Sequence, residues 1–214
     1  MKAREDRLFA GVEDMALRAG LSRRDLGSLA AAGALEGLAG HRRTARWKVL
    51  GTDTDPLPLL RGVSTFERTP DLPHPAEGDD LAEDYAALGL TLGRHPVALL
   101  RDRLAKRGIL SAAQLSALAQ GRPARAAGLV ITRQKPGTAA GTAFVTLEDE
   151  TGTVNVVVWR DIAERQRKEF LGAQLLAVSG RVQREGTVVH LIARRLADLS
   201  PLLGRLSARS RDFH

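Results

Sequence analysis

Residues 133–159 have the sequence RQKPGTAAGTAFVTLEDETGTVNVVVW, which contains the clearest strand pattern of the chain. It contains two alternating runs, Thr142–Leu147 and Val154–Trp159, separated by the turn signal Glu150-Thr151-Gly152. Successive side chains of a strand point to opposite sides, so every second residue of each run lies on the same face. In both runs one of these faces is entirely aliphatic. The two runs therefore predict neighbouring strands that share a buried aliphatic face.

Further β-rich runs flank this pair, at Ala126–Thr132, Leu175–Val182 and Val188–Ala193, and a polar helical stretch at Ile162–Phe170 precedes the fourth run. Three strands, a helix and two strands is the element order of the five-stranded Greek-key oligonucleotide-binding (OB) barrel. A β-sandwich of this length would not need the helix. We therefore predict an α+β protein with an OB-fold barrel at residues 124–199.

The chain before the barrel shows helical patterns. Gly20 and Leu21 separate two short helical runs, and Ser22 with Asp25 forms a capping-box pattern at the start of the second. A third helix is predicted from about Arg42 to Leu50. Residues 51–80 are rich in Pro, Asp, Thr and Gly without sustained periodicity, which indicates a linker. The predicted organisation is a helix-hairpin-helix-like segment at 1–50, a linker with the domain boundary at 51–80, connector helices at 81–123, the barrel, and a C-terminal tail at 200–214.

Composition restricts the partners. Lysine and arginine exceed the acidic residues to give a formal charge of +7, which favours a polyanion such as nucleic acid. The absence of cysteine excludes disulfides and thiolate metal sites. No apolar run approaches the roughly 20 residues that span a bilayer, and the opening MKAREDRLFAG lacks the apolar core of a signal peptide. We expect a cytoplasmic protein without a membrane partner.

Residues 133–159 resemble the C-terminal barrel of bacterial C-family DNA polymerases, and most closely the error-prone, damage-induced branch. GLSRRDLGSLAAAGALEGL at 20–38 is similar to the end of that family's tandem helix-hairpin-helix region, and YAALGLTLGRHP at 85–96 to its connector. Residues 178–203 and the terminal SRDFH resemble its last strands and tail. Two positions depart: Ala140, where the family usually has lysine, and Arg160, where proline is common. The first change removes a phosphate contact that the resemblance would imply.

The resemblance implies the non-catalytic DNA-binding region of a polymerase that acts in translesion synthesis and damage-induced mutagenesis. Such polymerases hold two magnesium ions with a carboxylate cluster. No aspartate motif in a suitable β context occurs here, and we interpret the pairs Asp79/Asp80 and Asp53/Asp55 as solvated linker charge. We therefore expect no catalytic residue, metal or cofactor in this segment.

Phe144 is the first candidate binding residue. The aliphatic face of its strand is the better core, so Phe144 should lie on the outer surface with Thr142 and Thr146, where an aromatic ring can stack on a base. The alternative is a reversed register with Phe144 buried. Asn155 is the expected neighbour of Phe144 on the next strand. Trp159 has two open interpretations, a second stacking surface or a cover for the barrel mouth packed on the 162–170 helix.

Basic residues supply candidate phosphate contacts. Arg133 and Lys135 fall in the predicted loop between the first two strands, and Arg181 and Arg184 lead into the loop between the last two. These loops flank the binding face of an OB fold. The alternative is ordinary solvated loop charge.

Arg23 and Arg24 fall in the first turn of a helix, where the macrodipole disfavours cations. A phosphate bound at the same helix end would explain the mismatch, although exposed arginines can also extend into solvent.

The leading functional hypothesis is binding of single-stranded DNA by the barrel and of duplex phosphates by the helical hairpin. A docking module for other mutagenesis proteins and an RNA-binding barrel like the anticodon domains of aminoacyl-tRNA synthetases are the alternatives. The segment Pro56–Leu60 loosely resembles sliding-clamp-binding peptides but lacks their glutamine and aromatic residue. We interpret it as a spacer.

Overall fold

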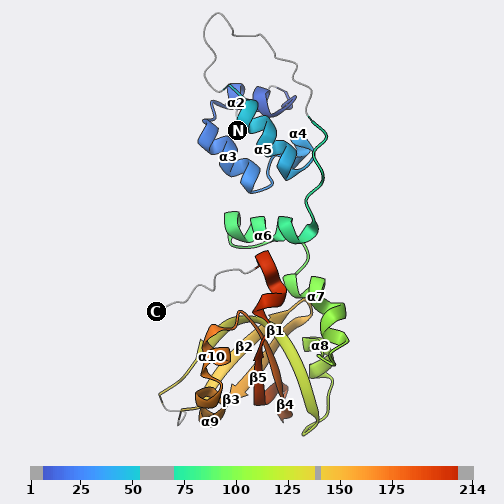
Figure 1. The fold of residues 1–214 in the computed structure, drawn as a ribbon, viewed down its shortest axis with the longest axis vertical. Helices are drawn as coiled ribbons and strands as arrows, with labels where there is room; N and C mark the ends of the chain where they lie inside the picture. Colours follow the sequence, from blue (N-terminus) through green and yellow to red (C-terminus); the bar gives the residue numbers. More distant parts are fainter. Residues whose placement is uncertain (1–6, 54–69, 138–140, 207–214) are drawn as a thin grey trace, which may run out of the picture. The chain divides into compact units, whose positions relative to one another are not determined.

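The computed structural model describes residues 7–53, 70–137 and 141–206 (Figure 1). The chain divides into two compact units, Met1–Leu92 and Gly93–His214. Each unit is described by itself. The Pro56–Leu60 segment, Ala140 and the terminal SRDFH lie outside the described residues. In the part of the chain that is described, no helix is long and apolar enough to cross a membrane.

The first unit is helical, as its sequence predicts. Gly20, at φ 62°, ends the first helix, and the predicted capping box starts the second: the Asp25 amide donates to Ser22 Oγ at 3.2 Å, and the Ser22 amide donates to Asp25 Oδ2 at 3.0 Å. Apolar side chains from these helices pack into one core that includes Leu26 and Leu35. The helices are α2 (Val12–Ala19), α3 (Arg23–Ala31), α4 (Glu36–Ala39), α5 (Arg42–Gly51) and α6 (Glu77–Leu88).

Helix α6 begins inside the stretch predicted as linker. Its acidic residues bind α5: the guanidinium of Arg42, only 5% exposed, donates to Asp84 Oδ1 at 2.5 Å and to the carbonyl of Asp80 at 2.9 Å. A buried cation needs such partners, and they hold α6 against the helical core. The linker prediction is therefore wrong for residues 77–80, and the boundary between units falls after Leu92 instead of within 51–80.

The second unit opens with two capped helices, α7 (Pro96–Ala105) and α8 (Ala112–Ser116). His95 caps α7, because its Nδ1 accepts the Val97 amide at 3.2 Å. Burial lowers the pKa of His95 and so favours the neutral ring that can accept this bond. A capping box at Ser111 starts α8, which ends at Ser116.

Asp149 joins both helices to the barrel. Its side chain is 1% exposed and accepts hydrogen bonds from Arg101 of α7 at 3.0 Å and from the Ala112 amide of α8 at 2.7 Å. Thr151 adds its amide and hydroxyl, both at 2.7 Å. A single buried carboxylate therefore connects the connector helices to the turn between the second and third strands.

The barrel confirms the predicted OB topology. Its strands close in the order β1-β2-β3-β5-β4, and the β3–β5 pair is parallel (Figure 1). Aliphatic residues from all the strands, with Ile162 and Phe170 from the intervening helices, form its core. The elements are β1 (Pro123–Gln134), β2 (Ala143–Asp149), β3 (Gly152–Val158), α9 (Arg160–Arg165), α10 (Arg167–Gly172), β4 (Leu175–Glu185), β5 (Val188–Asp198) and the 3-10 helix η2 (Ser200–Leu206), which opens the predicted tail.

Candidate nucleic-acid interface

The register of β2 places Phe144 on the outer surface of the barrel. Ala143, Val145 and Leu147 are at most 1% exposed, whereas Phe144 remains 38% exposed. The reversed register is therefore wrong, and the predicted orientation is confirmed. Thr142 is a correction: it is buried, because it precedes the first residue of β2 and does not follow the strand alternation.

Cross-strand pairing places apolar residues of two further strands beside Phe144, the buried Val157 and the half-buried Ile192. Phe144 lies opposite Val157 of β3, and Val157 lies opposite Ile192 of β5. We call these three residues the apolar row. One step along the strands, Thr146 lies opposite Asn155, which lies opposite His190; these three form the polar row. The two rows together are the strand face, an apolar strip beside hydrogen-bonding side chains.

Asn155 and Trp159 lie where an interface would need them. Asn155 is half-buried in the polar row, next to the row of Phe144. Trp159 follows β3 as the N-cap residue of α9 and is 51% exposed. This exposure does not fit a side chain that covers the barrel mouth, and it favours the stacking interpretation of Trp159.

Cations lie at both ends of the apolar row. At one end Gln134 of β1 lies opposite Phe144 and is followed by the exposed Lys135. At the other end Arg181 of β4 lies opposite Ile192, with a guanidinium nitrogen 2.9 Å from the carbonyl oxygen of Gly121. One carbonyl uses one of the five donors of an arginine, so Arg181 keeps donors for another ligand.

Arg133 does not lie in the loop where the sequence predicts it, because β1 extends to Gln134. A β-bulge between Val130 and Thr132 shifts the alternation of β1, and the Arg133 side chain points to the end of the barrel. Its Nε donates to the carbonyl of Phe170 at 2.7 Å, and a second nitrogen donates to the carbonyl of Ala173, at the C-terminal end of α10. A cation at this helix end satisfies free carbonyls. Arg133 therefore has a structural role.

Arg184 has a similar arrangement at the end of α8. It lies within β4, and its guanidinium donates to the carbonyl of Leu118 at 3.1 Å and to that of Ser116. Arg184 therefore leads into the β4–β5 loop, as predicted, but its side chain contacts the connector.

Arg23 and Arg24 belong to the other unit. The guanidinium of Arg23 donates to the Thr52 carbonyl at 3.3 Å, and Arg24 is exposed. The carboxylate of Asp25 already occupies this helix end, and its hydrogen bonds from Ser22 lower its pKa. Binding of a phosphate here stays a prediction, and the capping box leaves fewer free amides for it than the sequence suggests.

Two sets of residues were missed by sequence reasoning. Ile192 and His190 join the strand face only through the parallel β3–β5 pairing, which no local pattern reveals. Arg125 and Arg194 line a pocket beside Arg181, considered below. The signal that could have found Arg194 is the pair Arg194-Arg195, which interrupts the alternation of β5 between the buried Ala193 and Leu196.

The aspartates interpreted as linker charge are only partly described. Asp79 pairs with Arg43 at 3.3 Å, and Asp80 lies beside Arg42, whereas Asp55 lies outside the described residues. No group of three or more His, Asp or Glu side chains within the described ranges is arranged to hold a metal ion.

These features define a class. Residues 124–199 match the OB-fold nucleic acid binding domain family, the same range as the barrel predicted from the sequence. The chain contains an OB-fold nucleic-acid-binding domain.

Comparison with curated proteins identifies more specific relatives. The chain is 56% identical over 212 residues to an error-prone DNA polymerase of Alkalilimnicola ehrlichii, and 55% identical over 215 residues to one of Pseudomonas fluorescens. These matches cover 99% and 100% of this chain but 21% of each relative, so the chain spans about a fifth of the polymerases that it matches. It is a homologue of one segment of the error-prone DNA polymerases, and the resemblance found in the sequence is confirmed. Among solved structures, asparaginyl-tRNA synthetase from Pyrococcus horikoshii matches 49% of this chain and 24% of its own at 21% identity and a TM-score of 0.38.

Proposed function

We propose that this chain is the part of an error-prone DNA polymerase that holds single-stranded template DNA during translesion synthesis, and that the strand face of the OB barrel is the binding surface. The activity of the whole polymerase belongs to the same proposal, since the chain spans only about a fifth of its relatives.

The observation that supports this proposal best is the position of Phe144. Phe144 is 38% exposed on a strand whose aliphatic residues are fully buried. The apolar row continues from Phe144 through Val157 to Ile192. An exposed aromatic ring on the face of an OB barrel is a surface on which a base can stack, and stacking contributes roughly 1 to 3 kcal/mol per base. Trp159, exposed after the next strand, is placed to contact a second base.

The surroundings of Phe144 suit a single strand. Thr146, Asn155 and His190 present donors and acceptors to base edges, while Lys135 and Arg181 lie at the two ends of the apolar row. A protein that binds a single strand contacts its bases with apolar side chains and its phosphates with cations. In a duplex the bases are stacked inside the helix and cannot reach the apolar row. The arrangement therefore favours single-stranded over double-stranded DNA.

Fluorescence anisotropy with the full chain tests the proposal. The probes are a labelled oligothymidylate of about 12 nucleotides, within the site size of OB folds, and a blunt duplex of the same length. We expect tighter binding of the single strand, and a linear fall of log K with log salt between roughly 50 and 200 mM, because neutralised phosphates release counterions. Equal, salt-insensitive binding of both forms would contradict the proposal. An oligouridylate probe of the same length separates DNA preference from RNA preference.

A further inference from the structure

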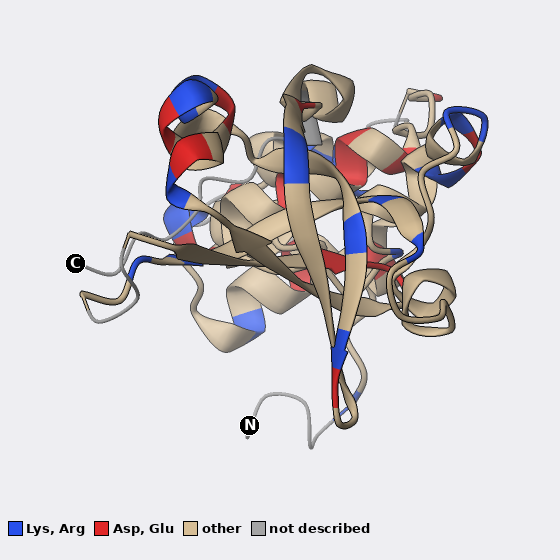
Figure 2. Cartoon of the chain, turned by 90° about the horizontal axis from the view of Figure 1, so that it is seen from below, with Lys and Arg blue, Asp and Glu red and all other residues tan. Residues whose placement is uncertain are grey.

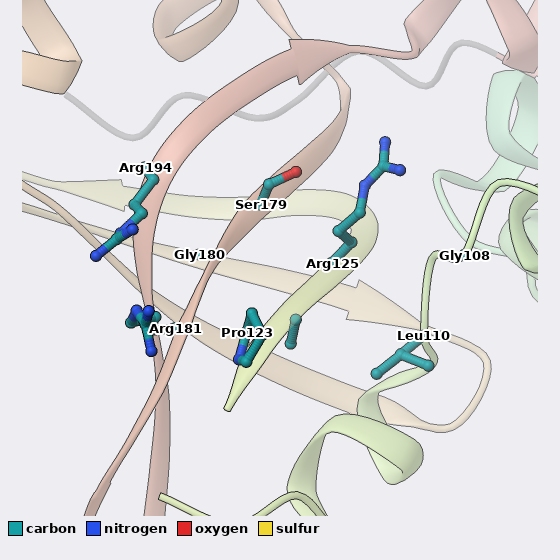
Figure 3. A pocket seen from close by; sticks show the side chains of 9 residues that line it. Gly108, Leu110, Pro123, Arg125, Ser179, Gly180, Arg181 and Arg194 are labelled. Carbon is teal, nitrogen blue, oxygen red and sulfur yellow. The ribbon is translucent and has the colours of Figure 1, made fainter. Parts of the chain in front are cut away.

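A pocket lies on the outer surface of the barrel, beyond the β4 end of the apolar row. Its volume is about 410 Å³, and it is lined by three arginines, Arg125 of β1, Arg181 of β4 and Arg194 of β5. Ser179 adds a hydroxyl group, and Gly108 and Gly180 add backbone (Figure 3). Figure 3 shows Arg181 and Arg194 on one side of the pocket and Arg125 on the other.

A β-bulge explains why Arg194 faces this pocket. Ser179 pairs with Arg195, but the next residue, Gly180, pairs with Ala193, so Arg194 is the additional residue of β5. A bulge of this kind changes the direction of a side chain, and both Arg194 and Arg195 are exposed. The bulge requires Gly180, because a Cβ there would lie 2.1 Å from the carbonyl oxygen of Ile192.

The arginines are oriented but not neutralised. Arg125 donates to the carbonyl of Arg107 at 3.0 Å, and Arg181 to that of Gly121 at 2.9 Å. Each carbonyl uses one donor and leaves the others available. No carboxylate in the described part of the chain forms an ion pair with any of the three, in contrast to Arg42, whose charge is balanced by α6. Guanidinium ions that line one pocket without a paired carboxylate favour an anion with several acceptor oxygens.

The strand register connects this pocket to the strand face. The pairings run from Phe144 to Val157, then to Ile192, and then to Arg181. Three strand spacings separate Phe144 from Arg181, about 14 Å along the sheet surface. In Figure 2 the long strands of the barrel carry basic positions along their length. A single strand that stacks on Phe144 can follow this row across the barrel and reach the pocket with its backbone.

We propose that Arg125, Arg181 and Arg194 form a phosphate-binding pocket that holds an internal phosphodiester of the bound strand, on the far side of the apolar row from Lys135. The inference rests on the proposed function and extends it by a defined path: from the β1–β2 loop, across Phe144 and Ile192, to the β4–β5 bulge. An acidic peptide would find the same charges, but it would not need the aromatic surface at the other end of the row.

The test compares two lengths of oligothymidylate without terminal phosphates, about 4 and about 12 nucleotides, both within the range of site sizes of OB folds. Arg194→Gln is the first variant, because in the described structure Arg194 has no hydrogen bond that the fold would lose. Arg125→Gln/Arg194→Gln is the second. Arg167→Gln on α10, an exposed arginine outside the pocket, is the matched control, and Phe144→Leu reports on the strand face.

We expect the double variant to reduce the salt slope for the longer probe by about 0.7, which corresponds to the one phosphate that the pocket holds, and Arg194→Gln alone to reduce it by less. The double variant should bind the longer probe roughly tenfold more weakly, as for loss of charged hydrogen bonds, and the shorter probe within about twofold of wild type. If Phe144→Leu weakens both probes while the arginine variants bind like the control, the pocket lies off the path and this inference fails, although the proposed function stands. If no variant weakens either probe, both fail. Circular dichroism of each variant confirms that it is folded.

Discussion

Substitutions of Phe144 can distinguish its contribution to DNA binding from its contribution to the stability of the fold, because the residue is partly exposed. Full burial of a phenylalanine contributes about 1.5 to 3 kcal/mol. At 38% exposure the burial that Phe144→Ala removes corresponds to about 1 to 2 kcal/mol of unfolding free energy. The same change removes the stacking contact with one base, which contributes about 1 to 3 kcal/mol of binding free energy. The dissociation constant should therefore rise roughly 5- to 150-fold.

Phe144→Leu is the sharper variant. Leucine keeps an apolar side chain against Val157 and should cost less than about 1.5 kcal/mol in stability, but it has no aromatic ring for a base. We therefore expect both variants to lose affinity for single-stranded DNA and only the alanine variant to lose appreciable stability. Fluorescence anisotropy measures the affinity, and urea unfolding followed by circular dichroism measures the stability.

Two results would refute the reasoning. Wild-type affinity in the leucine variant would show that no base stacks on Phe144. A destabilisation of about 3 to 5 kcal/mol in the alanine variant, the usual cost for a fully buried phenylalanine, would show that Phe144 belongs to the core in solution.

Four further predictions concern residues of the barrel and its connector helices. Arg133→Gln should lower the melting temperature but leave single-strand affinity within about twofold, because the guanidinium of Arg133 binds the carbonyls at the end of α10. A large loss of affinity would show that Arg133 contacts DNA. Asp149→Ala should cost about 3 kcal/mol in urea unfolding, since it leaves the buried Ala112 amide without its acceptor and removes one of the two carboxylates that bind Arg101. Asp161→Ala, which breaks an exposed ion pair, should change stability by less than about 0.5 kcal/mol. Burial lowers the pKa of His95 in the folded state, so the unfolded chain takes up more protons as the pH falls through about 6.5 and stability falls with it. His95→Asn keeps a helix cap and should lose less stability than wild type between about pH 7.5 and 5.5 in thermal melts; equal losses would show that His95 does not contribute.

The parts of the fold that the sequence predicts depend on short-range chemistry. The capping boxes at Ser22 and Ser111 need only residues three positions apart. The orientation of Phe144 follows from the two-residue period of β2, and the range 124–199 follows from the order of the strands and the helix. These features are visible in a single sequence because the side chains that define them are close together in the chain.

The parts that the sequence does not predict depend on long-range pairing. Helix α6 lies in a stretch rich in turn residues, and its position depends on ion pairs with Arg42, more than thirty residues earlier. Arg133 was assigned to a loop because the bulge after Val130 cannot be inferred from the local pattern. The positions of Ile192 and Arg194 in the candidate interface follow only from the pairing of β5 with β3 and β4.

The distribution of charge also limits what the net charge of +7 can mean for binding. Helix α5 carries several basic residues, but Arg42, Arg43 and Arg46 are all paired with carboxylates of α6, the last of them at 2.8 Å from Glu83. On the barrel, Arg125, Arg181 and Arg194 bind backbone carbonyls or no described group. A carbonyl orients a guanidinium without cancelling its charge, whereas a carboxylate does both. The positive potential available to a phosphate is therefore greater at these barrel strands than at α5, and the salt dependence of binding should respond to substitution of the barrel arginines before those of α5.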